Sequence, residues 1–335
     1  MERSSPGELY IVLNPKSGSG AGAHVRAEVE RELARRGLRF RIDETRGPGH
    51  ATQLALDAVR AGETTIVAAG GDGTIHEVAN GILSANQPAR ATLGLIPIGT
   101  GNDFVKVVPG TTPRSRAYDT LARGHTRRFD AGRVRWQGGE EWFVNGMGTG
   151  IDVEVVRQIE RSRNLPAVLV YIVGLVKALA RYRPMPLRLT MDGLESERRV
   201  MMAAVTNGAC IGGSFHVCPG ARPDDGWLNV CIVDELRLPG ILRVVARILR
   251  GAHRGSRAVE MRQARTVTIR SSADVPLFFQ LDGELREPAD AWSIHVSIDA
   301  GALPVVAEPV TGATSPAEGS TSRASVASAV ESEDT

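Results

Sequence analysis

The feature that most constrains this chain is a turn of small residues directly after an apolar run. The run Thr65–Ala69 predicts a buried strand, and the segment after it, Gly70–Glu77, reads GGDGTIHE. Apolar residues then recur at helical spacing through Ile82, so a helix is expected to follow the turn. Glycines let a backbone approach a ligand closely, and a helix N-terminus offers free N–H groups to phosphate. The segment therefore predicts a phosphate-binding turn.

The carboxylate of Asp72 does not attract phosphate, so its partner in such a turn would be a phosphate-bound metal ion or a hydroxyl group. A helix-capping Asp in a tight turn is the alternative. Two further Gly-rich turns favour ligand binding: Asn14–Gly22 follows the strand Leu9–Leu13, and Gly99–Phe104 follows the strand Leu93–Ile98. Ligands bind at the carboxyl ends of strands in open α/β sheets, so the three turns are expected to converge.

Strand and helix signals alternate in the first part of the chain, which predicts a parallel sheet with helices on both faces. From Thr126 onward β signals dominate and indicate a second, mostly antiparallel domain. The four strands expected in the first part are Leu9–Leu13, Arg39–Asp43, Thr65–Ala69 and Leu93–Ile98.

A dinucleotide-binding turn is the main rival interpretation of the first loop. Gly18–Ala23 matches the G-x-G-x-x-A fingerprint, and Asp43 follows about twenty residues later. Four residues, Asn14–Ser17, separate the strand from these glycines and loosen the tight turn that the fingerprint needs. A dehydrogenase would also leave the turns at Asp72 and Asp103 unexplained. The chain contains no Walker-type P-loop.

The three turns, in this order and spacing, resemble the diacylglycerol kinase catalytic family, bacterial lipid kinases related to sphingosine and ceramide kinases and more distantly to NAD kinase. The resemblance covers about residues 8–305. Phe143–Asp152 is similar to the start of the family's second domain, Pro219–Leu228 to its metal-site loop and Leu281–Glu284 to its catalytic turn. The GGDGT core alone is less specific, because NAD kinases and phosphofructokinases share it.

The resemblance implies an α/β + β fold. A Rossmann-like parallel-sheet nucleotide domain would span residues 1–130. A mostly antiparallel β-sandwich would span 131–305, its final segment returning toward the first domain and the active cleft lying between the two. After residue 305 the composition shifts to Ser, Thr, Ala, Glu and Gly, which predicts a disordered tail over 306–335.

Phosphoryl transfer requires bound phosphates, a metal ion and a base near the accepting hydroxyl. The resemblance implies ATP and Mg²⁺, with Thr45 and Thr100 matching ATP-contacting threonines of the family. Lys16 could add a charge, although a solvated loop lysine is the simpler interpretation. The residues expected to bind the nucleotide are Asn14, Pro15, Lys16, Ser17, Gly18, Thr45, Gly71, Asp72, Gly73, Thr74, Glu77 and Thr100.

The resemblance assigns Asp72 and Asp103 to catalytic Mg²⁺ or to orienting the acceptor. A second, structural Mg²⁺ would be held by the side chain of Asp225 and the backbone carbonyls of Arg222 and Trp227. Oxygen ligands suit Mg²⁺. The alternative for Asp225 is an ordinary type I turn residue. Asp130 matches a further acidic residue of the family's polar network.

Asp282 and Glu284 flank Gly283 and could form a simple hairpin turn. In the family this turn supplies the general base for the lipid hydroxyl. Residues two apart on an extended chain point the same way, so one acid could be the base and the other its orienter. The sequence does not rank the two. His76, one turn into the helix beside Asp72, is expected to be solvated or capping.

A basic stretch predicts contact with a membrane. Residues 237–270 contain nine arginines and one acidic residue, and Arg243, Arg247 and Arg250 share one face of the predicted helix Gly240–Arg250. A solvated stripe is the plain interpretation. The functional one is transient docking on an anionic membrane surface, where a lipid substrate resides.

Composition sets further bounds. The net charge of +2 argues against a nucleic-acid partner, and three cysteines without metal-ligand spacing suit a reducing cytosol. The N-terminus lacks signal-peptide features, and the longest apolar run, Leu165–Val176, is too short to span a bilayer. We therefore expect a cytoplasmic, peripherally membrane-associated protein, with a homodimer left open.

These inferences predict an ATP- and Mg²⁺-dependent lipid kinase that phosphorylates the hydroxyl of diacylglycerol or a related lipid. One alternative is another acceptor, such as phosphatidylglycerol, a sphingoid base or a soluble polyol. The other is a catalytically inactive regulator that binds nucleotide or lipid.

Overall fold

The computed structural model describes residues 7–20, 22–85, 91–99, 101–160, 184–213, 215–273 and 275–309. Thr100 and the apolar run Leu165–Val176 lie outside the described residues. In the described part of the chain, no helix is long and apolar enough to cross a membrane.

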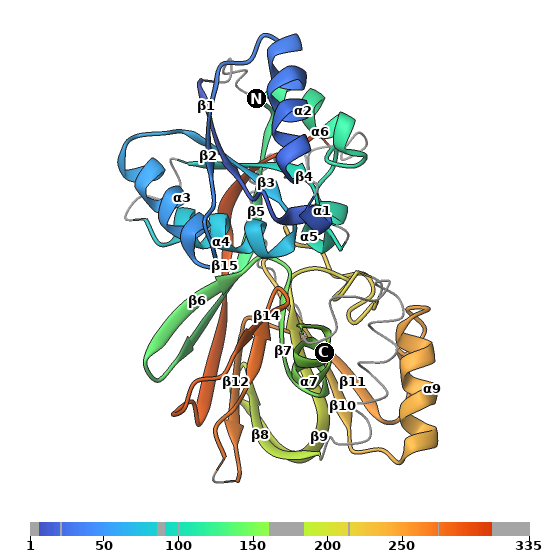
Figure 1. Cartoon of the computed structure of the whole chain (residues 1–335). Coiled ribbons are helices and arrows are strands. Elements are labelled where there is room, and N and C mark those ends of the chain that lie inside the picture. The colour runs from blue at the N-terminus through green and yellow to red at the C-terminus, as the bar shows by residue number, and fades with distance from the viewer. Residues whose placement is uncertain are drawn as a thin grey trace, which may run out of the picture.

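The N-terminal lobe is a parallel sheet with helices on both faces, as predicted (Figure 1). Its strands lie side by side in the order β4-β3-β1-β2, and they are β1 (Leu9–Leu13), β2 (Phe40–Glu44), β3 (Thr65–Gly70) and β4 (Thr92–Pro97). Its helices are α1 (Ser17–Gly20), α2 (Gly22–Arg35), α3 (His50–Arg60), α4 (Asp72–Leu83), α5 (Asp103–Val107) and α6 (Arg114–Arg123). Every residue of β1 is buried, which explains its continuous apolar sequence LYIVL.

Two apolar clusters show which helices cover which face of this sheet. Apolar side chains of α2 and α6, such as Val29 and Leu121, pack on one face. Alanines of α3 and apolar residues of α4, such as Ala55 and Val78, pack on the other. The helix behind the GGDGT turn is therefore held between α3 and the sheet.

The second lobe is built mainly from antiparallel strands around its own apolar core, as predicted (Figure 1). Its strands are β5 (Thr126–Trp136), β6 (Gly139–Phe143), β7 (Gly146–Gly150), β8 (Met185–Met191), β9 (Leu194–Thr206), β10 (Leu228–Asp234), β11 (Val259–Ala264), β12 (Thr266–Ser271), β13 (Phe279–Leu281), β14 (Glu284–Arg286) and β15 (Ser293–Val306). Among the residues that the structure describes, these strands are flanked by the helices α7 (Ile151–Glu160) and α9 (Leu238–Ile248).

A long two-stranded ribbon joins the lobes. β15 pairs antiparallel with β5 along most of its length, and its end pairs parallel with β4 through Val305 and Leu93. The final segment thus returns to the first lobe. β5 runs without a break across the domain boundary expected after residue 130.

The expected start of the tail at residue 306 is wrong. Val306 is still in β15, and the N–H of Ala307 donates to the His125 carbonyl. Glu308 accepts hydrogen bonds from Arg116 and Arg123 of α6, at 2.8 and 2.6 Å. These residues complete the first lobe, and residues 310–335 lie outside the described part of the chain.

The close packing of α4 on α3 depends on Gly81. A Cβ at this position would lie 2.6 Å from the Ala55 Cβ and 2.5 Å from the Thr52 carbonyl oxygen. A glycine inside a helix costs about 0.5–1 kcal/mol relative to alanine, so close packing is the structural reason for it here.

We expect Gly81→Ala to lower the free energy of unfolding by about 1–3 kcal/mol, because overpacking outweighs the gain in helix propensity. Chemical denaturation measures it. Gly240→Ala in α9 is the matched control, since its new Cβ would meet only the Leu236 side chain, at 3.1 Å from its Cδ2 and 3.5 Å or more from its Cβ and Cγ. A stabilised Gly81→Ala protein would contradict the packing described for α3 and α4.

Candidate active site

Three turns meet at the carboxyl ends of β1, β3 and β4. The Asn14 side-chain amide donates to the Thr74 hydroxyl at 3.0 Å, and the Asn14 N–H donates to the Ala69 carbonyl at 3.0 Å. The third turn touches the second, because a Cβ on Gly99 would lie only 2.6 Å from the Gly71 Cα. The convergence predicted for the three Gly-rich turns is therefore present.

The GGDGT turn leads into α4 one turn earlier than the apolar spacing indicates. α4 begins at Asp72, so the N–H groups of Asp72, Gly73 and Thr74 lie in its first turn and have no helical acceptor. The Asp72 side chain does not cap α4. Its Oδ1 instead accepts the N–H of Asp103 at 2.7 Å, at the start of α5. Asp72 thus fixes the second turn to the third.

Asp72 lies in a strongly acidic environment. Burial, followed by repulsion from Asp103 and Asp282, raises the pKa of the Asp72 carboxyl to about 6. No three His, Cys, Asp or Glu side chains of the described residues form a group that could hold a metal ion. A metal at Asp72 would therefore need phosphate and water oxygens for its other ligands, which is how Mg²⁺ is usually bound at phosphates.

Asp103, the other acid expected at the metal, connects the two lobes. Both of its carboxylate oxygens lie 2.9 Å from the N–H of Gly213 in the second lobe. Lys106 lies 3.2 Å from the same carboxylate and donates to the Gly213 carbonyl at 2.7 Å. The three residues form an interlobe contact, so this carboxylate is already occupied by protein donors.

The Asp282 carboxylate is saturated with hydrogen bonds. Its four donors are the backbone N–H groups of Val144, Asn145 and Gly146 and the Nδ1 of His76, each 2.9 Å away. A carboxylate offers about four acceptor positions, so none remains for a substrate proton. Asp282 and Gly283, with φ of 51° and 92°, also form the two-residue turn between β13 and β14. The hairpin interpretation is therefore correct for this pair.

His76 is buried between two carboxylates, and the expectation that it is solvated or capping is wrong. Its Nδ1 faces Asp282 at 2.9 Å and its Nε2 faces Glu141 at 2.8 Å. Burial alone lowers the pKa of His76, but the hydrogen bonds to both carboxylates outweigh it and raise the pKa to about 9. Arg286 in turn pairs with Glu141 through two nitrogens. An imidazolium therefore joins α4 of the first lobe to the hairpin of the second.

Glu284 is the acid of the hairpin that faces the turn of small residues. Its Oε1 lies so close to Gly73 that any Cβ on that glycine would collide with it. Within the described part of the chain, no residue hydrogen-bonds or ion-pairs with the Glu284 carboxylate. It lines the same cavity as Asp72, so its oxygens are open to a ligand there.

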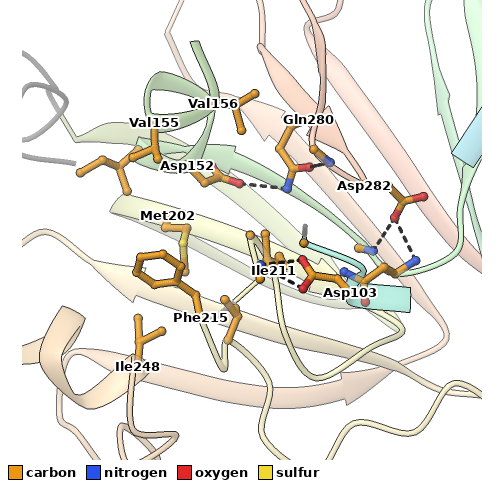
Figure 2. A pocket seen from close by; sticks show the side chains of 18 of the residues that line it. Asp103, Asp152, Val155, Val156, Met202, Ile211, Phe215, Ile248, Gln280 and Asp282 are labelled. Carbon is orange, nitrogen blue, oxygen red and sulfur yellow. Dashed lines mark hydrogen bonds between the residues drawn. The ribbon is translucent and has the colours of Figure 1, made fainter. Parts of the chain in front are cut away.

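A cavity of about 340 Å³ extends from these acids into the second lobe. Asp72, Asp103 and Glu284 line its polar end. Figure 2 shows how apolar side chains surround the rest of it, from α7, β9, α9 and the loop before β10. Those that the figure labels are Val155, Val156, Met202, Ile211, Phe215 and Ile248.

Two polar side chains line the apolar part of this cavity. Asp152 and Gln280 are joined by a hydrogen bond of 3.4 Å (Figure 2). Burial raises the pKa of Asp152 to about 6. Gln280 also accepts the N–H of Gly283 at 2.7 Å, so this pair supports the β13–β14 hairpin. Sequence reasoning did not single out Asp152 or Gln280, although Asp152 lies at the end of the Phe143–Asp152 segment.

Of the remaining nucleotide-site candidates, Thr45 lines a second cavity of about 470 Å³ at the end of β2, together with His50. The Thr45 N–H donates to the Leu13 carbonyl at 2.9 Å, which places Thr45 beside the first turn. Glu77 accepts the N–H groups of Gly49 and Ala51, at 2.8 and 3.0 Å. Its carboxylate thus stabilises the start of α3, and a contact of Glu77 with the nucleotide stays a prediction.

The expected structural metal loop is well ordered by its own carboxylates. Asp225 accepts the Trp227 N–H at 3.0 Å, and Asp130 accepts the N–H groups of Gly226 and Gly301, both at 2.7 Å. Burial, followed by repulsion from Asp130, raises the pKa of Asp225. An acid in such surroundings fits a cation. Binding of Mg²⁺ by Asp225, Arg222 and Trp227 stays a prediction.

Comparison with known proteins identifies the two lobes. Residues 8–134 match the diacylglycerol kinase catalytic domain, and residues 145–307 match the YegS C-terminal NAD kinase beta sandwich-like domain. A diacylglycerol kinase of Bacillus subtilis is 31% identical over 278 residues, which are 82% of this chain and 88% of the relative. One of Mycobacterium tuberculosis is 30% identical over 274 residues, 80% of this chain and 87% of the relative.

Solved structures share the fold. A crystal structure of a diacylglycerol kinase from Bacillus anthracis superposes with a TM-score of 0.69 at 22% identity, covering 91% of this chain and 97% of that one. A putative diacylglycerol kinase from the same organism gives a TM-score of 0.72 at 23% identity, covering 91% and 98%. With both domains matched in order and relatives at about 30% identity over most of its length, the chain belongs to the diacylglycerol kinase family of lipid kinases.

Proposed function

We propose that this lipid kinase depends on ATP and Mg²⁺ and phosphorylates the hydroxyl of diacylglycerol or a closely related lipid. The observation that carries the proposal is the cavity, which is polar beside the Gly-rich turns and apolar over the rest of its length. An acceptor with a hydroxyl at one end and acyl chains at the other fits this division. A soluble polyol would leave the apolar walls without a partner.

The first lobe supplies the groups suited to ATP. The free N–H groups of Gly73 and Thr74 and the turn at Ser17 and Gly18 would hold phosphates, because helix N-termini attract anions. Thr45 in the second cavity would contact the rest of the nucleotide. When bound, Mg²⁺ would neutralise charge on the phosphates, and Asp72 is the carboxylate whose surroundings fit it.

Glu284 is the proposed general base. Its carboxylate is open to the cavity and lies against Gly73 of the phosphate turn, whereas Asp282 has no acceptor position left. As the acceptor oxygen bonds to phosphorus, its proton passes to Glu284. Asp282 then fixes the hairpin, which keeps Glu284 within hydrogen-bond reach of the acceptor hydroxyl.

Asp152 gives the acceptor a second polar contact. With a pKa of about 6, its carboxyl is in part protonated near that pH and would donate a hydrogen bond to a lipid ester carbonyl. When ionised it would instead favour the ammonium group of a sphingoid base. The acceptor panel below separates these two candidates.

We expect Asp72→Asn to abolish turnover and stabilise the protein. At pH 7 without ligand, a buried carboxylate with a pKa of about 6 opposes folding by up to about 3 kcal/mol. This raised pKa makes the wild type lose stability as the pH rises from about 4 through 6, and the variant should not. Thermal unfolding and kcat are the measurements.

The matched control is Asp57→Asn, an exposed carboxylate of α3. It should leave both quantities unchanged. A kcat of Asp72→Asn within about threefold of wild type would remove Asp72 from the catalytic machinery, since threefold is less than 1 kcal/mol of barrier.

Glu284→Gln and Asp282→Asn should differ in their effects on kcat and on the melting temperature. We expect Glu284→Gln to lower kcat by about 10²–10⁴-fold with no change in melting temperature, because it removes only a base. Asp282→Asn should lower both, because it takes from the buried His76 imidazolium one of its two carboxylate partners, at a cost of up to about 3–5 kcal/mol. Asp290→Asn, exposed beyond the hairpin, is the control.

Wild type should be assayed with ATP, Mg²⁺ and a panel of acceptors: diacylglycerol, phosphatidylglycerol and a sphingoid base in micelles, and glycerol in solution. Mass spectrometry reads the products. We expect the diacylglycerol to be phosphorylated most efficiently. Phosphorylation of glycerol alone, or ATP binding without any product, would overturn the proposed function.

A further inference from the structure

α9 and its C-cap residue Leu249 carry three exposed leucines on one strip of the helix surface. Leu238, Leu242 and Leu249 are 57%, 53% and 45% exposed, at intervals of four and seven residues that align them along one side of the helix. Isolated exposed leucines are ordinary on protein surfaces, but an aligned group is typical of an interaction site. The strip is defined here as the leucine ridge.

The side of α9 that faces the protein is part of the lipid cavity. Val244 and Ile248 are buried in the second lobe, and Ile241 and Val245 line the cavity next to them. Going around the helix, Ile241 and Val245 come directly before the leucine ridge. The apolar lining of the cavity therefore continues onto the outside of the molecule without an intervening polar residue of α9.

The far side of the ridge is basic. Arg243, Arg247 and Arg250 are exposed and recur three and four residues apart, as the sequence predicts. Among the described residues, none forms an ion pair with these three guanidinium groups, although most other arginines of the second lobe do. Figure 1 places α9 at the outer edge of this lobe.

We propose that α9 is an interfacial helix that docks the enzyme on an anionic bilayer and opens the cavity toward its lipid. The leucine ridge inserts among the acyl chains, and the three arginines bind the phosphates of the headgroups. Ile241 and Val245 then give the lipid chains a continuous apolar path into the cavity. The proposal rests on the lipid-kinase function above and adds its membrane-binding surface.

The partner of this surface is a membrane, because the leucine ridge and the three arginines both fit one. A protein partner would pair the arginines with acids but gives no reason for the ridge to adjoin the cavity lining. Salt separates the two contributions to this membrane binding. Burial of the apolar leucines is insensitive to salt, whereas the attraction of the arginines to anionic lipid is screened by it.

Flotation of the whole chain with vesicles of phosphatidylcholine and phosphatidylglycerol, without ATP, tests docking separately from catalysis. We expect the triple variant Leu238→Gln, Leu242→Gln, Leu249→Gln to reduce vesicle binding at least tenfold at high salt. The triple variant Arg243→Gln, Arg247→Gln, Arg250→Gln should reduce it only at low salt. The control is Leu194→Gln, a leucine that is 64% exposed at the turn between β8 and β9.

Activity on two substrates completes the test. Both triple variants should keep wild-type kcat/KM on a short-chain diacylglycerol in solution and lose at least tenfold on a long-chain one in vesicles. An equal loss on both substrates, or wild-type flotation of the leucine variant, would overturn the proposal. Wild type that floats with vesicles but phosphorylates neither lipid would contradict the proposed function and leave the docking surface supported.

Two single variants keep the test decisive if a triple variant fails to fold. Leu242→Trp should add tryptophan fluorescence that brominated lipids quench when vesicles are added. The fluorescence that Leu194→Trp adds should not be quenched by these lipids. Equal quenching of the two would overturn the proposal. Self-association of wild type that the leucine changes abolish, without any vesicle binding, would overturn it in favour of an interface between two copies.

Discussion

Hydrogen bonds to the Asp282 carboxylate connect three parts of the structure that are far apart in the sequence. They fix the β13–β14 hairpin to the corner between β6 and β7 and, through His76, to helix α4 of the first lobe. Because α4 begins at the GGDGT turn, the same contacts set the position of Glu284 relative to Gly73. The geometry of the site depends on this carboxylate keeping its four hydrogen-bond donors.

The two acids of the hairpin therefore have different roles although they lie two residues apart. Asp282 adopts the left-handed conformation of the turn and points into backbone donors, while Glu284 begins β14 and faces the cavity. Glu141 extends the contacts by balancing the charge of His76, and Arg286 pairs with Glu141 in turn. A buried ionic cluster of this kind is costly if one member is lost, so each substitution within it should affect stability as well as activity.

Local patterns predicted the alternating strands, the three turns and their convergence, because each depends on residues close together in the sequence. They did not predict the burial of His76, since its carboxylate partners lie 65 and 206 positions away. For the same reason local patterns did not predict that the Glu77 carboxylate stabilises the start of α3, since its donors lie 28 and 26 positions away. The three-residue strands β13 and β14 are too short to show a period, and the leucines of α9 give the same helical pattern whether buried or exposed.

The most direct test of this account is the protonation state of His76, followed by NMR of the labelled imidazole across pH 5–10. Two carboxylates within hydrogen-bond distance should keep both ring nitrogens protonated at pH 8, with a pKa of about 9. Since the unfolded value is about 6.5, the stability from this group should be complete below pH 6.5 and lost as the pH rises through 9. A His76 that titrates at or below pH 6.5 would contradict the claim that its imidazolium joins the two lobes.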